Sequence, residues 1–196
     1  MPVNIGGGPE HGFDEPLGLL SDCHRRIERF LGVLARVAGD ARGGALNGEQ
    51  RKALDIALRY FREAAPKHTA DEEESLFPRM RACAGREAEQ ALDRVAALEA
   101  DHRRAEQLHA EVEALFNAWR DQGRLTSGPD ARLRDAIEEL QQIYGDHIRT
   151  EDEYVFPLAG RALDREAQLA IGREMAERRG VLPGVASDIV AADKLR

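Results

Sequence analysis

The chain has 196 residues, of which 42% are hydrophobic and 33% charged, and this predicts one globular domain with a buried core. A formal net charge of −8 argues against general binding to nucleic acids or to anionic membranes. The sequence contains no apolar run of transmembrane length, and its N-terminus lacks the basic and apolar regions of a secretory signal. We therefore expect a cytoplasmic protein, and the widely separated Cys23 and Cys83 agree with a reducing compartment.

Strong helix formers dominate the composition, and apolar residues recur at helical spacing. After an irregular Gly- and Pro-containing segment at 1–13, the pattern predicts four long helices at about 15–38, 48–83, 87–122 and 130–159. Their short connections predict an all-α, up-down-up-down four-helix bundle over 14–160. A shorter helix at about 163–179, followed by a tail, accounts for 161–196.

Three prolines fall inside the helical patterns. Proline lacks a backbone donor and clashes with the preceding turn, so Pro78 and Pro157 predict a bend near the end of the second and fourth helices. Pro66 lies two residues before His68 and predicts a local opening of the second helix there.

The two halves of the chain carry the same pattern of histidine and glutamate. The pentapeptide HRRIE at 24–28 recurs as HRRAE at 102–106, and His68-x3-Glu72-x4-Phe-Pro recurs as His147-x3-Glu151-x4-Phe-Pro. Each histidine therefore has a glutamate four residues later, on the same face of a helix and about 6 Å along its axis. Four helices that present such pairs inward would form a metal site.

Not all of these residues fit the apolar seams of their helices equally well. A single histidine on an apolar face is usually a core residue, but a matched set of buried glutamates requires partners or metal ions. The four histidines, Glu72 and Glu151 occupy the seams, whereas Glu28 and Glu106 lie one position away from them. The predicted metal ligands are His24, Glu28, His68, Glu72, His102, Glu106, His147 and Glu151.

Mixed imidazole and carboxylate ligands suit iron, manganese or zinc better than calcium or copper(I). Glu72 and Glu151 are the best candidates to bridge two ions, which favours iron or manganese. His109 lies two turns from His102, about 10.5 Å along the axis, so we expect it to pack near the site without binding metal. We expect no role for His11, which lies in the irregular N-terminal segment.

Together these motifs resemble the hemerythrin-like (HHE cation-binding) family over about residues 15–160. The resemblance implies a four-helix bundle around two iron ions joined by an oxo or hydroxo bridge, with Glu72 and Glu151 as bridging carboxylates. The oxygen-carrying members have a second histidine where this chain has Glu106, and they have no ligand where Glu28 stands. If Glu28 fills the open iron position, reversible O2 carriage is not expected; if it does not, O2 chemistry stays open.

The resemblance predicts a non-heme di-iron protein that senses or handles O2, nitric oxide, peroxide or iron. The sequence does not indicate a substrate pocket, so we expect no enzymatic activity and name no catalytic residues. The alternatives are a di-iron enzyme that activates O2 or reduces peroxide or nitric oxide, and a zinc-binding or metal-free helical scaffold. We expect a monomer or homodimer with a small-molecule ligand such as O2 or NO.

Overall fold

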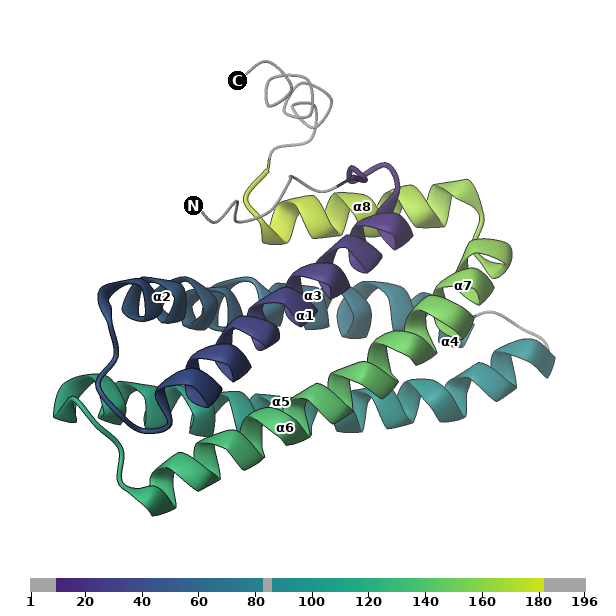
Figure 1. Ribbon diagram of the computed structural model, residues 1–196. Coiled ribbons are helices and arrows are strands. Elements are labelled where there is room, and N and C mark those ends of the chain that lie inside the picture. Colours follow the sequence, from purple (N-terminus) through teal and green to yellow (C-terminus); the bar gives the residue numbers. More distant parts are fainter. Residues whose placement is uncertain (1–9, 83–85, 182–196) are drawn as a thin grey trace. The chain divides into compact units, whose positions relative to one another are not determined.

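The computed structural model describes residues 10–82 and 86–181, and all regular structure in these ranges is helical (Figure 1). The chain therefore has the all-α fold class that the sequence predicts. The helices in order are α1 (Pro16–Ala41), α2 (Gly48–Glu63), α3 (Ala65–Ala70), the π-helical η1 (Asp71–Leu76), α4 (Phe77–Ala82), α5 (Arg86–Gln122), α6 (Ser127–Thr150), the π-helical η2 (Glu151–Val155), α7 (Phe156–Ala162) and α8 (Arg165–Arg178).

Close contacts divide the chain into two units. Unit 1 combines 1–26, 66–95 and 150–196, and unit 2 combines 27–65 and 96–149. Both α1 and α5 contribute residues to each unit. The predicted boundaries at residues 13 and 160 stay predictions, because each unit is assembled from separate stretches of the chain. Cys83 and most of the expected C-terminal tail lie outside the described residues.

Unit 2 consists of four helical stretches, from α1, α2, α5 and α6, that run in alternating directions (Figure 1). Leucines and aromatic residues on their inner faces form one core, which includes Leu34, Leu54, Phe116 and Leu140. Asn47 begins α2 with a reciprocal capping box, because its side chain accepts the Gln50 N–H while the Gln50 side chain accepts the Asn47 N–H.

The loops of unit 2 are tied together at one end. The buried Trp119 indole donates to the Gly44 carbonyl at 2.7 Å, and the Leu125 N–H donates to the Gly43 carbonyl at 2.9 Å. Gly43 has a φ of +71° with the Leu125 carbonyl beside it, so a side chain there would be strained as well as crowded.

In unit 1 the predicted C-terminal helix is present as α8, and the chain before α1 packs against it. The Phe13 carbonyl approaches Gly172 so closely that a Cβ on Gly172 would lie 1.7 Å from its oxygen. The His11 N–H donates to the buried Asp22 carboxylate at 2.9 Å, and the His11 ring lies over Gly18. The expectation that His11 has no role is therefore wrong for packing, because this residue helps to fix the N-terminal stretch.

The prolines interrupt the second and fourth helices more sharply than bends would. The prediction of one continuous helix over 48–83 is wrong, because α2 ends at Glu63 and Pro66, which has no N–H to donate, lies at the start of α3. The Phe-Pro pairs are each preceded by a π turn, in which Phe77 donates to the Glu72 carbonyl and Phe156 to the Glu151 carbonyl. A proline ring clashes with the carbonyl four residues before it, and the wider π turn relieves this clash.

Candidate metal centre

Four predicted ligands come together in the interior of unit 1. His24 lies on α1, His68 on α3, Glu72 in η1 and Glu151 in η2. One donor atom of each lies within 4.8 Å of the donor atoms of the other three. All four side chains are buried, and both glutamates are inaccessible to solvent. Two carboxylates buried at one place need nearby positive charge, which protonated histidines or a cation can supply.

The spacing of these donors matches that of ligands around one metal ion. His24 Nε2 lies 3.0 Å from Glu151 Oε2, and His68 Nε2 lies 3.2 Å from Glu72 Oε1. Ligand atoms about 2.1 Å from an ion and at right angles to each other are about 3 Å apart. His24 Nε2 is also 3.9 Å from Glu72 Oε1, within the span of opposite ligands. The four side chains therefore fit a transition-metal ion in both chemistry and size.

The local backbone explains how both glutamates reach this interior position. Each π turn begins at or next to a glutamate and ends at the following Phe-Pro pair, so the two copies of the sequence motif adopt the same backbone. A π turn contains one more residue than an α-turn, and such turns are frequent at functional sites. The Phe156 ring, directly after η2, stacks on the His24 ring with centroids 5.4 Å apart.

The second nitrogen of His24 is held by an acidic residue. His24 Nδ1 lies 3.1 Å from Asp152 Oδ1, which also accepts the Ser21 hydroxyl at 2.7 Å. This contact directs Nε2 towards Glu151. Burial lowers the pKa of His24, but the carboxylates of Asp152, Glu151 and Glu72 outweigh it and hold that pKa well above the usual value. A metal ion at this position would compete with a proton for His24, because a histidine ligand has to be deprotonated at the nitrogen that binds.

Two further predicted ligands pair within unit 2. His102 Nε2 lies 3.1 Å from His147 Nε2, the same spacing as neighbouring ligands on one ion. His147 Nδ1 is 3.4 Å from Asp101 Oδ2, so Nε2 is left to face His102. The pair thus repeats the arrangement of His24 and Asp152, an aspartate behind the ring and the other nitrogen directed inward.

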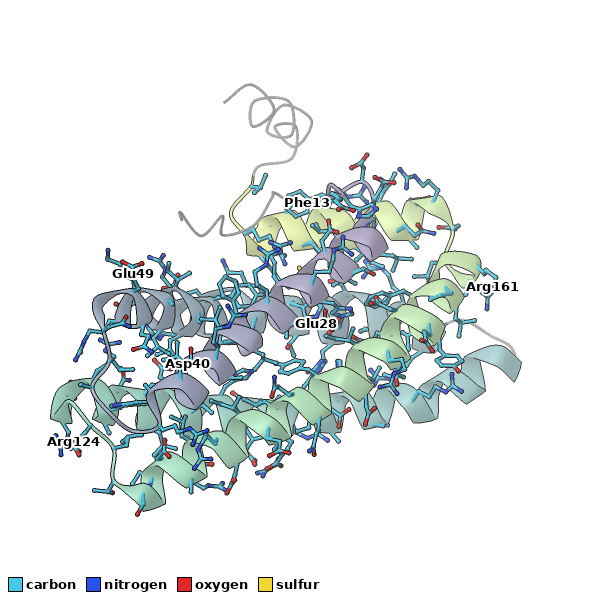
Figure 2. The ribbon with its side chains drawn as sticks, in the orientation of Figure 1. Phe13, Glu28, Asp40, Glu49, Arg124 and Arg161 are labelled. Carbon is cyan, nitrogen blue, oxygen red and sulfur yellow. The ribbon has the colours of Figure 1, made fainter. Side chains whose placement is uncertain are left out.

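The structure does not place Glu28 and Glu106 with these side chains. Glu28 on α1, labelled in Figure 2, and Glu106 on α5 both have exposed side chains. Neither belongs to the group of donors in unit 1 described above. Their assignment as metal ligands stays a prediction. In sequence they lie next to the buried Ile27 and Ala105, which occupy the inward-facing positions. His109 packs against Phe61 and Tyr144, in line with a packing role.

Asp101 and Asp152 were missed by reasoning from the sequence. Each is adjacent to a predicted ligand, Asp101 before His102 and Asp152 after Glu151, and each contacts a histidine from another part of the chain. Histidine ligands commonly donate their second nitrogen to a carboxylate. The sequence feature that could have indicated them is an acidic residue adjacent to a predicted ligand. Many exposed acidic residues have the same feature, so it is a weak one.

Comparison with known proteins agrees with this geometry. Residues 15–159 match the hemerythrin HHE cation-binding domain. The chain belongs to this family. A relative from Haemophilus influenzae is 28% identical over 170 residues, which cover 86% of this chain and 92% of that protein, and it is described as an uncharacterized protein. The HHE domain and the buried His and Glu side chains together fit a metal-binding protein.

No helix in the described part of the chain combines the length and the apolar character that crossing a membrane requires.

Proposed function

We propose that this hemerythrin-like protein binds two iron ions and uses them to sense or handle a small molecule such as O2, nitric oxide or peroxide. The observation that carries the proposal is the buried set of two imidazoles and two carboxylates in unit 1, with neighbouring donors at 3.0 and 3.2 Å. Mixed nitrogen and oxygen ligands of this kind suit iron, manganese or zinc. The match to the HHE domain supports iron among these metals.

We propose that one ion binds His24 and His68 together with Glu72 and Glu151 in unit 1, and that His102 and His147 in unit 2 bind the second ion. The repeated sequence motif supports this division, since each half of the chain supplies two histidines and one glutamate. Bridging carboxylates are the role that the family resemblance implies for these glutamates. Asp152 and Asp101 would orient His24 and His147 and make them more basic ligands.

The exposed Glu28 and Glu106 bear on the chemistry that such a site supports. Without them each ion has fewer protein ligands than the six positions that iron commonly fills, so positions stay open for a small molecule. This favours a site that binds O2 or NO over a site saturated by protein. Iron would supply the redox chemistry in this proposal, and the protein supplies a buried cluster of imidazole and carboxylate ligands.

Metal analysis of the purified protein tests the proposal. We expect about two iron ions per chain, the number that paired carboxylate-bridged sites hold. Glu72→Ala and the isosteric Glu72→Gln should lose most of the iron, because each removes a buried anionic ligand. His109→Ala should keep it. Less than about 0.2 equivalents of any transition metal in the native protein would overturn the proposal, and zinc alone would favour a structural site.

Two matched variants decide the role of the exposed glutamates. Glu28→Gln and Glu106→Gln should keep the full iron content and the optical spectrum of the native protein. A second measurement adds O2 or NO to the reduced protein and follows the spectrum. A new absorption band would indicate an open position on iron. A spectrum that neither ligand changes would contradict the open position.

A further inference from the structure

A histidine and a tyrosine that take no part in the proposed metal ligation form a pair in unit 2. His109 Nε2 on α5 lies 3.1 Å from the Tyr144 hydroxyl on α6. The Tyr144 ring also lies against the ring of His147, with centroids 6.3 Å apart and the planes nearly perpendicular. The phenol therefore stands between a partly buried imidazole and a residue that is proposed to bind metal.

His109 is suited to accept a proton from this phenol. Its ring stacks on Phe61 with centroids 4.2 Å apart, and burial lowers its pKa to about 4. The imidazole is thus neutral near pH 7, and a neutral imidazole has one nitrogen with a free lone pair. In the tautomer that carries its proton on Nδ1, Nε2 accepts the hydrogen bond of the Tyr144 hydroxyl, 3.1 Å away.

The pair is also part of a continuous series of ring contacts. Tyr144 and His109 have centroids 5.8 Å apart, His109 stacks on Phe61, and Phe61 meets Tyr60 at 5.4 Å. Tyr60 is only partly buried, so the series leads from His147 towards the surface of unit 2. The chain has three tyrosines, and two of them belong to this series, in a sequence with only 5% aromatic residues.

We propose that Tyr144 is a redox-active tyrosine that gives one electron to a one-electron oxidant and its proton to His109. The phenolic O–H bond breaks, the proton bonds to His109 Nε2, and the products are a neutral phenoxyl radical and an imidazolium. The oxidant, of the class of oxidised transition-metal centres, is reduced by one electron. Return of an electron from a reductant and of the proton from His109 restores the phenol, and Tyr60 provides a second site for the radical nearer the surface.

The natural oxidant in this proposal rests on the proposed metal site, but the pair itself does not. The test therefore uses metal-free protein and photogenerated tris(bipyridine)ruthenium(III) as the oxidant. All variants carry Tyr154→Phe, because the side chain of Tyr154 in unit 1 is exposed and would react first. Electron paramagnetic resonance of frozen samples measures the radical, and tyrosine deuterated on its ring identifies it.

We expect a long-lived tyrosyl signal that Tyr144→Phe abolishes. His109→Phe should shorten its lifetime about tenfold, because no base then keeps the phenolic proton beside the radical. His109→Gln keeps an acceptor but offers no base, and it should behave like His109→Phe while it preserves the fold by circular dichroism. Tyr60→Phe should slow the formation of the signal.

A signal that survives Tyr144→Phe would overturn the proposal, and so would a lifetime that neither His109 variant changes. The second result would leave the tyrosine and histidine as core packing alone. Because iron content does not enter this measurement, its failure can be told apart from a failure of the proposed metal site.

Discussion

His24 and His147 are each held from behind by an aspartate, at 3.1 and 3.4 Å. Asp152 accepts from His24 Nδ1 and is itself held by the Ser21 hydroxyl. We expect Asp152→Asn to weaken metal binding roughly 10- to 100-fold, as losses of such supporting carboxylates do. Competition with a chelator measures the change. Glu153→Gln, a neighbouring exposed acid, is the matched control, and equal affinities for the two variants would contradict the role of Asp152.

A second prediction concerns the effect of His109 on the pH dependence of stability. Its pKa falls from 6.5 to about 4 in the folded protein, so between these values the unfolded chain binds a proton that the native protein does not. This residue therefore has no effect on stability above pH 6.5 and destabilises the fold increasingly as the pH falls towards 4. The full cost is about 3 kcal/mol. Urea unfolding of the native protein and of His109→Phe at pH 7.5 and 4.5 measures it.

Lowering the pH from 7.5 to 4.5 should reduce the stability of the native protein more than that of His109→Phe. A cost of the substitution that does not depend on pH leaves this comparison unchanged. His24 acts in the opposite direction, because carboxylates raise its pKa and its contribution is lost as the pH rises through that value. It is present in both proteins and cancels in the comparison. An equal loss of stability in the two proteins would contradict a lowered pKa for the partly buried His109.

Reasoning from the sequence is strong for residues that lie on an apolar seam. His24, His68, Glu72 and Glu151 were predicted because polar groups recur there at the helical period, and the structure brings these four together. The repeated pentapeptide predicts Glu28 and Glu106 as ligands as well, although the helical period places them one position away from the seam. A difference of one residue turns a side chain by about 100° around a helix, and both are exposed.

At the scale of elements, α8 contacts the π turn that carries Glu72. The buried Asp71 accepts from Arg178 at 3.0 Å and from Arg179 at 2.6 Å, and Arg178 also donates to the Ser75 hydroxyl at 2.8 Å. Burial raises the pKa of Asp71, whereas both arginines oppose the shift. These contacts hold η1 against the end of α8, next to the proposed ligand Glu72.

We expect Arg179→Met to destabilise the protein by roughly 1–3 kcal/mol, the usual effect of removing one partner of a buried charge. It should also weaken metal binding, because η1 is less firmly held. Urea unfolding and a chelator titration measure the two effects. Arg173→Met, at an exposed position of α8, the helix that Arg179 caps, should change neither. A similar loss in both variants would show that the effect belongs to α8 as a whole.

The π turns could not be predicted from the sequence. The Phe-Pro pairs indicated a disturbed helix, because proline forbids one backbone hydrogen bond. They did not indicate which relief the backbone adopts, since a kink, a break and a π turn all remove the same clash. The break at Ala64 and the two π turns arise from the same physical cause with different local packing.

For the whole molecule, the all-α class and the order of the helices followed from apolar periodicity and short loops. The contacts of α8 could not be predicted in this way, because Asp71 and Arg178 are 107 residues apart and the chain contains 28 basic and 36 acidic residues. Many pairings of such charges are possible on composition alone. The partner is selected by the burial of Asp71, which only the folded chain defines.

The last prediction concerns the effect of metal removal on the stability of the whole molecule. The donors in unit 1 come from four different elements, so a bound ion joins segments that are distant in the sequence. A ligand that binds only the native state stabilises it by about 4 kcal/mol at a concentration 1,000 times its dissociation constant. We expect a chelator to lower the midpoint of thermal unfolding of the native protein and to leave that of Glu72→Gln almost unchanged. Equal shifts in both would mean that the chelator acts at another site, and no shift in iron-loaded native protein would show that the ion does not support the fold.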